Sequence, residues 1–181
     1  IEEAENGTIW VGSSEGIKVY DVNLNVIDKI QVSIKNSSGN NVTAIYKDVK
    51  NDMWVGSEHG LHRYRLTPSG YTKQSYYSNP QDSISLSSNH ILSIAETENL
   101  SLLIGTYGDG VNIYSRTTNT FQKLKTENNI DGSIIRGILK DKNHHIWLST
   151  NTGLSKINAD GSVINLTTSE GVQAFNGGSA Q

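Results

Sequence analysis

Histidines and carboxylates are the side chains of this 181-residue sequence best suited to chemistry, and some of them lie close together in the sequence. In HGLH, His59 falls in an expected turn and His62 in the strand that follows, while His144 and His145 are adjacent in another turn. A metal site needs three or four converging ligands with supporting hydrogen bonds, which such pairs do not supply. We therefore expect solvated turn histidines, with no metal and no cofactor.

Two carboxylate pairs, Glu2 with Glu3 and Glu96 with Glu98, could be imagined as the acid and nucleophile of a glycosidase. That chemistry needs two carboxyl groups about 5 to 10 Å apart across a substrate. Neighbours in a strand point to opposite faces, so Glu2 and Glu3 diverge. There is no cysteine nucleophile, and because no long helix is expected, we expect no serine elbow between a strand and a helix. The sequence predicts no catalytic residues in this segment, with a lyase or glycosidase as the alternative.

The bulk composition argues against several other classes. The net charge is −3, and the 15 basic and 18 acidic residues are interspersed, which gives no electrostatic footprint for nucleic acid. No apolar run approaches the roughly 20 residues of a membrane helix, so we expect no membrane contact by this segment. The glycines of YGDG at 107–110 precede no helix and are expected to form a turn, not a phosphate cradle.

A repeat positions all of these side chains. Four stretches align on a large apolar residue with steps of 44, 49 and 44 positions: Trp10, Trp54, Leu103 and Trp147. A small residue follows two positions later, at Gly12, Gly56, Gly105 and Ser149, and a large one follows the next turn, at Tyr20, Tyr64, Tyr114 and Ile157. Because the tryptophans recur, we expect them to pack in the core and not to bind ligand.

Each unit is expected to hold four short strands, which in the second unit are 42–47, 53–57, 61–66 and 71–76. The first unit is expected to have lost its opening strand. Four-stranded units of about 45 residues are typical of β-propeller blades, whereas a β-sandwich does not need the same Trp and Gly every 44 positions. The predicted fold class is therefore all-β, a propeller of four-stranded antiparallel blades. The predicted blades are 1–38, 39–85, 86–130 and 131–170, with 171–181 starting a further one.

The repeat also resembles a known family, on KDVKNDMWVGSEHGLHRYR (47–65), YYSNPQDSISLSSNHILSI (76–94), KDKNHHIWLSTNTGLSKIN (140–158) and SEGVQAFNGGSAQ (169–181). These segments are similar to two-component regulator propeller repeats, and the resemblance covers essentially the whole chain. Leu103 in place of Trp and Ser149 in place of Gly depart from the pattern as tolerable packing changes.

The resemblance implies the periplasmic sensor portion of an inner-membrane hybrid two-component protein, whose propellers commonly have seven blades. Such sensors recognise oligosaccharides released from complex glycans and signal to a histidine kinase. This chain would supply about four blades of one propeller and could bind and transmit but not catalyse. A propeller enzyme and a purely protein-docking blade array are the alternatives.

Ligands of propellers usually meet the loops between second and third strands and those that enter the innermost strands. Sugars need a flat aromatic surface with hydrogen-bond donors and acceptors around it. The expected ligand-binding residues in these loops are Glu15, Glu58, His59, Asn89, His90, Tyr107, Asp109 and Asn151. Tyr107 beside Asp109 is the preferred candidate, and a half-buried turn aromatic is the alternative.

The expected partners are an oligosaccharide and either a second copy of the chain or further blades of the same protein. An open array of blades exposes two unpacked sheet faces, and exposed apolar faces favour association or ring closure.

Overall fold

The computed structural model describes residues 1–32, 40–126, 130, 132–167, 169 and 171–172, and this part folds into four separate four-stranded sheets. The first contains β1 (Glu2–Glu3), β2 (Ile9–Ser13), β3 (Gly16–Tyr20) and β4 (Val26–Ile30). The second contains β5 (Val42–Lys47), β6 (Met53–Ser57), β7 (Gly60–Thr67) and β8 (Gly70–Tyr76). The third contains β9 (Ile91–Glu96), β10 (Leu102–Thr106), β11 (Val111–Ser115) and β12 (Thr120–Lys123). The fourth contains β13 (Ile135–Lys140), β14 (Ile146–Thr150), β15 (Leu154–Ile157) and β16 (Val163–Leu166).

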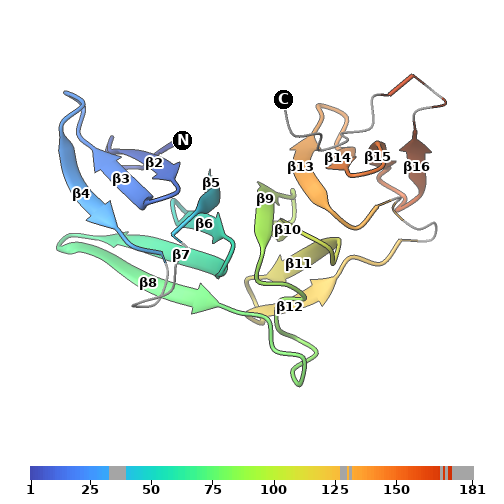
Figure 1. Cartoon of the computed structure of the whole chain (residues 1–181), viewed down its shortest axis with the longest axis horizontal. Helices are drawn as coiled ribbons and strands as arrows, with labels where there is room; N and C mark the ends of the chain where they lie inside the picture. Colours follow the sequence, from blue (N-terminus) through green and yellow to red (C-terminus); the bar gives the residue numbers. More distant parts are fainter. Residues whose placement is uncertain (33–39, 127–129, 131, 168, 170, 173–181) are drawn as a thin grey trace, which may run out of the picture.

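Within each sheet the strands follow one another in sequence order and pair antiparallel. The sheets fan out around a shared axis, with β5, β9 and β13 towards it and β8, β12 and β16 at the outside (Figure 1). Neighbouring inner strands contact each other, as β5 does β9 and β9 does β13. This rotational order is that of propeller blades and confirms the predicted fold class. In the part of the chain that the structure describes, no helix is long and apolar enough to cross a membrane.

Consecutive sheets interlock through a glycine that the repeat places on the second strand. A Cβ built on Gly56 would lie 2.6 Å from Ile91 Cγ2, and one on Gly105 would lie 2.8 Å from Ile135 Cγ2. Gly12 faces Val42 of the second sheet in the same way. The first residue of each of these inner strands therefore packs directly against the glycine of the preceding sheet. Any larger residue at the glycine position would clash with it, which explains why the glycine recurs.

In the first two of these interfaces, between the first and second sheets and between the second and third, a tryptophan packs against a tyrosine of the next sheet. The Trp10 ring packs edge-on against Tyr64 of the second sheet, with ring centroids 5.4 Å apart. The Trp54 ring packs against Tyr114 of the third sheet at 5.0 Å. Both tryptophans are at most 1% exposed, as expected of core residues. In the third interface Leu103 and Ile157 take the same places in an aliphatic cluster.

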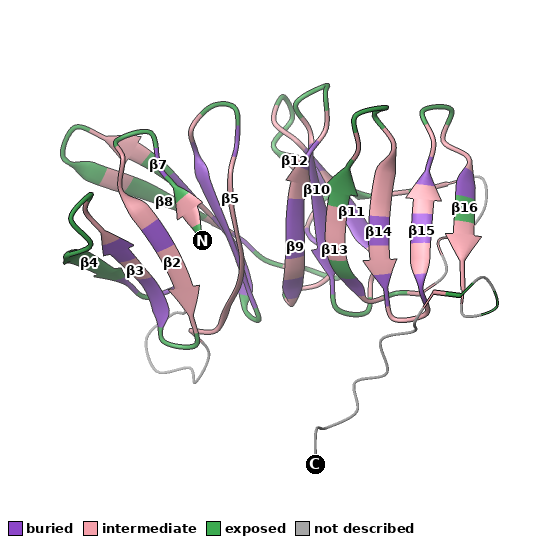
Figure 2. Cartoon of the chain, turned by 90° about the horizontal axis from the view of Figure 1, so that it is seen from above, coloured by how far each residue is buried: buried purple, intermediate pink, exposed green. Residues whose placement is uncertain are grey.

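Three expectations need correction or restriction. The first sheet keeps a short opening strand, because Glu2 and Glu3 pair with Trp10 and Ile9. Trp147 is only partly buried, since in the described part of the chain the fourth sheet has no further sheet beyond it (Figure 2). The further blade expected at 171–181 lies, beyond residue 172, outside the described residues. The strands expected in the second unit are observed, with β7 and β8 each starting one residue earlier and β7 ending one residue later.

Candidate functional site

A hydroxyl side chain builds the same turn between the second and third strands of every sheet. Ser57 Oγ donates to the Gly60 carbonyl at 3.1 Å and accepts from the His59 N–H at 3.1 Å. The same pair of hydrogen bonds recurs at Ser13, Thr106 and Thr150. Ser and Thr hydroxyls form local turns of this kind. The repeat therefore fixes four matching loops at one edge of the array and leaves their remaining side chains free to vary.

The loops that enter the inner strands join this edge. The Gly60 N–H donates to the Asn89 carbonyl, the Tyr107 N–H to the His90 carbonyl, and the Gly110 N–H to the Ser133 carbonyl. The first and third of these bonds tie a turn to the entry loop of the next sheet, and the second ties the third sheet's turn to that sheet's own entry loop. The two sets of loops expected to form a ligand surface are therefore adjacent at this edge.

The most developed feature of the edge is an aromatic pair between the third sheet's two loops. The His90 and Tyr107 rings stack with centroids 4.9 Å apart and an angle of 14° between their planes. Tyr107 is 50% exposed, so half of its surface is open to solvent even though His90 covers one face. Tyr107 is therefore a platform presented by an ordered loop.

Charged and hydroxyl groups line a cleft that begins at Gly108, the residue after Tyr107. Asp109 Oδ1 lies 3.7 Å from Lys123 Nζ, and both side chains are about half exposed. Together with Thr126 and Ser133 they line a cleft of about 690 Å³ between the third sheet and the loop that enters the fourth. An exposed aromatic ring beside donors and acceptors of both charges is the combination that a polar, flat-faced ligand requires.

The other predicted residues divide into exposed and structural ones. Glu58 and His59 are exposed, and Glu58 accepts a hydrogen bond from Asn41 Nδ2 at 2.7 Å. Glu15 is exposed beside Lys18. Asn89 and Asn151 instead hold the loops together: Asn89 Oδ1 accepts from the Ser78 N–H at 2.6 Å, and Asn151 Oδ1 accepts from the N–H groups of Ser133 and Ile134 at 3.1 Å. The structure thus stacks His90 on Tyr107, with Asp109 in the same turn as Tyr107, and leaves Glu15 in the turn of the first sheet and Glu58 and His59 in that of the second.

The histidines do not all lie in solvent, which corrects one expectation. His62 is 1% exposed, with Nδ1 2.9 Å from Ser75 Oγ, and its burial, with Lys73 nearby, lowers its pKa to about 4. His145 Nδ1 lies 2.9 Å from Asp141 Oδ2, whereas the exposed His144 contacts Glu98. Among the described residues, no group of three or more His, Cys, Asp or Glu converges as metal ligands would.

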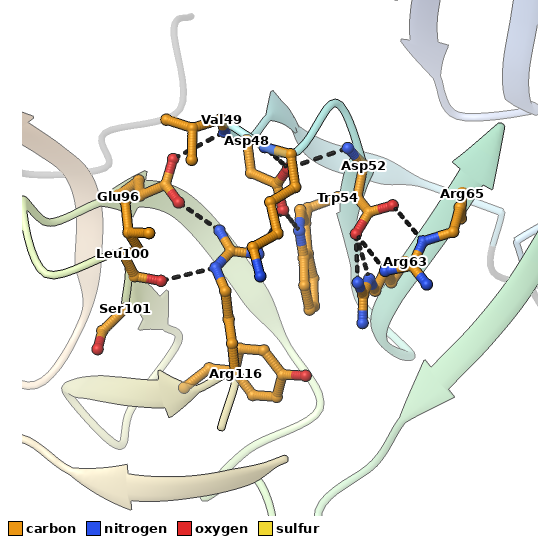
Figure 3. Close-up of polar contacts among 12 residues, drawn as sticks. Asp48, Val49, Asp52, Trp54, Arg63, Arg65, Glu96, Leu100, Ser101 and Arg116 are labelled. Atoms are coloured by element: carbon orange, nitrogen blue, oxygen red, sulfur yellow. Dashed lines mark hydrogen bonds and ion pairs between the residues drawn. The ribbon is translucent and has the colours of Figure 1, made fainter. Parts of the chain in front are cut away.

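A buried ionic cluster between the second and third sheets is absent from the sequence predictions. Arg116 contacts the carboxylates of Asp48 and Glu96, which are 0% and 4% exposed, and donates from Nε to the Leu100 carbonyl (Figure 3). Asp48 Oδ2 also accepts from the Trp54 indole N–H at 2.7 Å. Glu96 is therefore held in a structural ion pair and is not available as half of a glycosidase pair with Glu98.

A second buried carboxylate lies on the other side of Trp54. Asp52, 1% exposed, is paired with Arg63 and Arg65 of β7 (Figure 3). These hydrogen bonds outweigh the effect of burial and lower the pKa of the Asp52 carboxyl. An aspartate stands six positions before both Trp54 and Trp147, as Asp48 and Asp141. This recurrence could have indicated the role of Asp48 from the sequence. The arginine partners come from other strands and left no such signal.

Comparisons with known proteins bear out the resemblance found in the sequence. A family model described as "Two component regulator propeller" matches residues 36–59. A protein of Formosa agariphila named "Histidine kinase P4" is 36% identical over 163 residues, which are 87% of this chain. The chain spans only 12% of that relative's length.

The solved structures that resemble the chain include two extracellular domains of hybrid two-component systems from B. thetaiotaomicron. One is 25% identical with a TM-score of 0.73, and the match covers 91% of this chain and 22% of that one. The other is 21% identical with a TM-score of 0.75, over 93% and 25% of the two chains. A virginiamycin B lyase from Staphylococcus aureus, 15% identical with a TM-score of 0.67 over 92% of this chain and 54% of that one, shares the fold.

Proposed function

We propose that this array of two-component regulator propeller repeats is part of an extracytoplasmic sensor that recognises glycan-derived oligosaccharides and signals to a histidine kinase. The stacked, half-exposed Tyr107–His90 pair beside Asp109 and Lys123 is the observation that carries the proposal. The similarity to extracellular domains of hybrid two-component systems supports an extracytoplasmic location and a signalling role. In the whole protein, the sensor would lie in the periplasm.

The chemistry of the edge suits a sugar better than an apolar ligand. A pyranose ring presents a C–H face that packs on an aromatic ring and hydroxyl groups that exchange hydrogen bonds with carboxylates, ammonium groups and hydroxyls. The tyrosine ring supplies the first element, and Asp109, Lys123, Thr126 and Ser133 supply the second. Because Tyr107 and Gly110 are tied by backbone hydrogen bonds to His90 and Ser133, the platform is held in place before a ligand arrives.

Signalling requires more than binding. A ligand shifts an equilibrium between two arrangements of a sensor only if it binds one of them better. The cleft is lined by the third sheet and by the loop that enters the fourth, so an oligosaccharide that contacts both would favour one spacing of these blades.

The test is calorimetric titration of the folded chain with a panel of neutral and uronate-containing oligosaccharides, followed by substitutions. Tyr107→Ala should weaken the affinity roughly tenfold or more, whereas Tyr107→Phe should retain most of it because the ring is kept. Ile164→Ala, at a 48% exposed position on the outer strand β16, is the matched control and should have no effect. Null titrations across the panel, or equal affinity of the Ala and Phe variants, would refute the assignment of this site.

A further inference from the structure

The outward face of the fourth sheet is a largely apolar surface that no other sheet in the described part of the chain covers, although Lys156 of the same sheet lies over the Trp147 ring. Gly137, Leu139, Trp147, Ser149 and Leu154 line a groove of about 500 Å³, and Leu139 is 64% exposed. These residues correspond by the repeat to those that the next sheet covers in the other three blades. The groove therefore lies on the face with which each earlier sheet receives its neighbour, and Figure 1 shows the four sheets following one another around the axis.

One polar group on this face distinguishes it from a plain apolar surface. Asp141 Oδ2 accepts from the Trp147 indole N–H at 2.9 Å, as Asp48 Oδ2 does from Trp54. The indole bond and those from His145 hold the pKa of Asp141 below its usual range, so the carboxylate is charged. Its side chain is 24% exposed, whereas that of Asp48 is fully covered.

The three internal interfaces show what covers such a face. Where the position of Asp48 holds Ala4, the next sheet offers Leu66, two residues after its tyrosine. Where it holds Asp48, the next sheet offers Arg116, again two residues after its tyrosine. Where it holds the uncharged Thr97, the aligned residue of the next sheet is Ala159, which is also uncharged. A cation thus stands at this position only in the interface whose facing residue is a carboxylate.

We propose that the outward face of β13–β16 is the docking surface for a further blade, one that carries an aromatic residue on its third strand and an arginine two positions later. That arginine would pair with Asp141 as Arg116 pairs with Asp48. A glutamate at the end of the incoming blade's inner strand would hold the arginine, as Glu96 holds Arg116. Burying Asp141 without a cation from the incoming blade would be costly, because a buried carboxylate loses its hydration.

A second copy of this chain does not meet that requirement. Its complementary surface is the open face of the first sheet, where Tyr20 aligns with Tyr114 but Val22 stands at the position of Arg116. Head-to-tail docking of two copies would therefore bring Val22 towards Asp141 and leave the carboxylate without a cation. The occupant is a further repeat of the same polypeptide, in line with a chain that spans 22% of a similar solved structure.

Ser149 adds a second requirement. The aligned glycines of the other sheets receive Val42, Ile91 and Ile135, and none of them has room for a Cβ. Because Ser149 has one, the incoming blade must begin its inner strand with a smaller residue, such as alanine.

The experiment extends the 181-residue chain at its C-terminus with a copy of its own third unit, residues 86–130, which carries Glu96, Tyr114 and Arg116. The matched control extension is a copy of the second unit, residues 39–85, in which Leu66 replaces the arginine. In each appended copy, the residue that would meet Ser149 is changed to alanine. This change is Ile91→Ala in the third-unit copy and Val42→Ala in the second-unit copy. Hydrogen exchange of the Trp147 indole N–H, followed by NMR, reports whether the face is covered.

The third-unit extension should slow this exchange roughly tenfold more than the second-unit extension. Arg116→Leu made only in the appended copy should remove that difference while the parent chain stays unchanged. Asp141→Asn should remove it too, and the two changes together should cause no further loss. Equal protection by both extensions would overturn the proposal, as would an unextended chain that forms oligomers in sedimentation and protects Trp147 by itself.

Discussion

The interface between the first and second sheets and the interface between the second and third each contain a tryptophan at the same repeat position, Trp10 and Trp54. The two interfaces differ in whether the indole N–H has a hydrogen-bond partner. Trp54 donates to Asp48, whose charge is matched by Arg116. Trp10 has Ala4 in place of the aspartate, and among the described residues its buried Nε1 has no hydrogen-bond partner. The tyrosines follow the same division: Tyr114 Oη donates to Asn119 Oδ1 at 2.8 Å, whereas the buried Tyr64 hydroxyl has no partner in the described chain.

The comparison teaches that packing sets the repeat and polar pairing is optional. Both interfaces bury the tryptophan to within 1% of complete burial. A buried donor without a partner costs about 1 to 3 kcal/mol, and a buried ion pair returns little more than its desolvation cost. The fold can therefore accommodate either kind of interface, but mutations in the two should change the free energy of unfolding differently.

The largest expected effect is at the polar interface. Arg116→Leu should destabilise the chain by about 3 to 5 kcal/mol, because it leaves Asp48 and Glu96 buried without a cation. Denaturant unfolding followed by tryptophan fluorescence measures the change. The triple variant Asp48→Ala, Glu96→Gln, Arg116→Leu imitates the apolar interface and should recover much of the loss. A triple variant as unstable as the single one would show that the two interfaces are not interchangeable.

The second effect is a pH dependence of the apolar interface. His62 lies on β7 on the same face as Tyr64, and its pKa of about 4 in the folded chain compares with about 6.5 when unfolded. Folding therefore favours the neutral ring, and this stability is present above pH 6.5 and is lost as the pH falls towards 4. The loss should reach about 3 kcal/mol.

Unfolding measured between about pH 7 and pH 4 should show a slope that His62→Gln flattens. His59→Gln, at an exposed position in the adjacent turn, should leave the slope unchanged. An identical slope in the wild-type chain and the His62→Gln variant would exclude this histidine as the source.

A smaller effect separates the two tyrosines. Tyr64→Phe removes a buried hydroxyl without a partner among the described residues and should be neutral or stabilise by up to about 1 kcal/mol. Tyr114→Phe removes a hydroxyl bonded to Asn119 and near Tyr76, and should destabilise by about 1 kcal/mol. Parallel thermal unfolding of the two variants measures the difference, and shifts of the same sign would contradict the contrast between the interfaces.

The smallest effect concerns the turn that supports the polar interface. Leu100 has a φ of 62°, a left-handed conformation, and its aligned residues are Gly7, Asn51 and His144. A branched apolar side chain is disfavoured there, so Leu100→Asn should stabilise by about 1 kcal/mol or less. The carbonyl that accepts from Arg116 is kept in this variant. Thermal unfolding measures it, with Asn51→Leu expected to shift stability in the opposite direction.

Much of the architecture can be predicted from the sequence, because residues with the same local role in packing or turn formation recur in several units. The glycine two positions after Trp54, the hydroxyl of Ser57 and the turn that ends at Gly60 each recur, so their roles in close packing and turn formation could be inferred without coordinates. The strand positions of the second unit and the clustering of the loops with His90 and Tyr107 followed from the same spacing.

The interfaces were decided by contacts between residues far apart in the chain. Arg116 lies 68 positions from Asp48, and a buried ion pair leaves no periodic mark when only one interface contains it. The burial of His62 was likewise hidden, because HGLH looks like a polar turn until Ser75 and Tyr77 pack against the ring. Turns and strands depend on residues that are neighbours in sequence, so they can be predicted from the sequence. The pairing and desolvation of charged groups depend on which sheets pack together, and only the tertiary structure determines that.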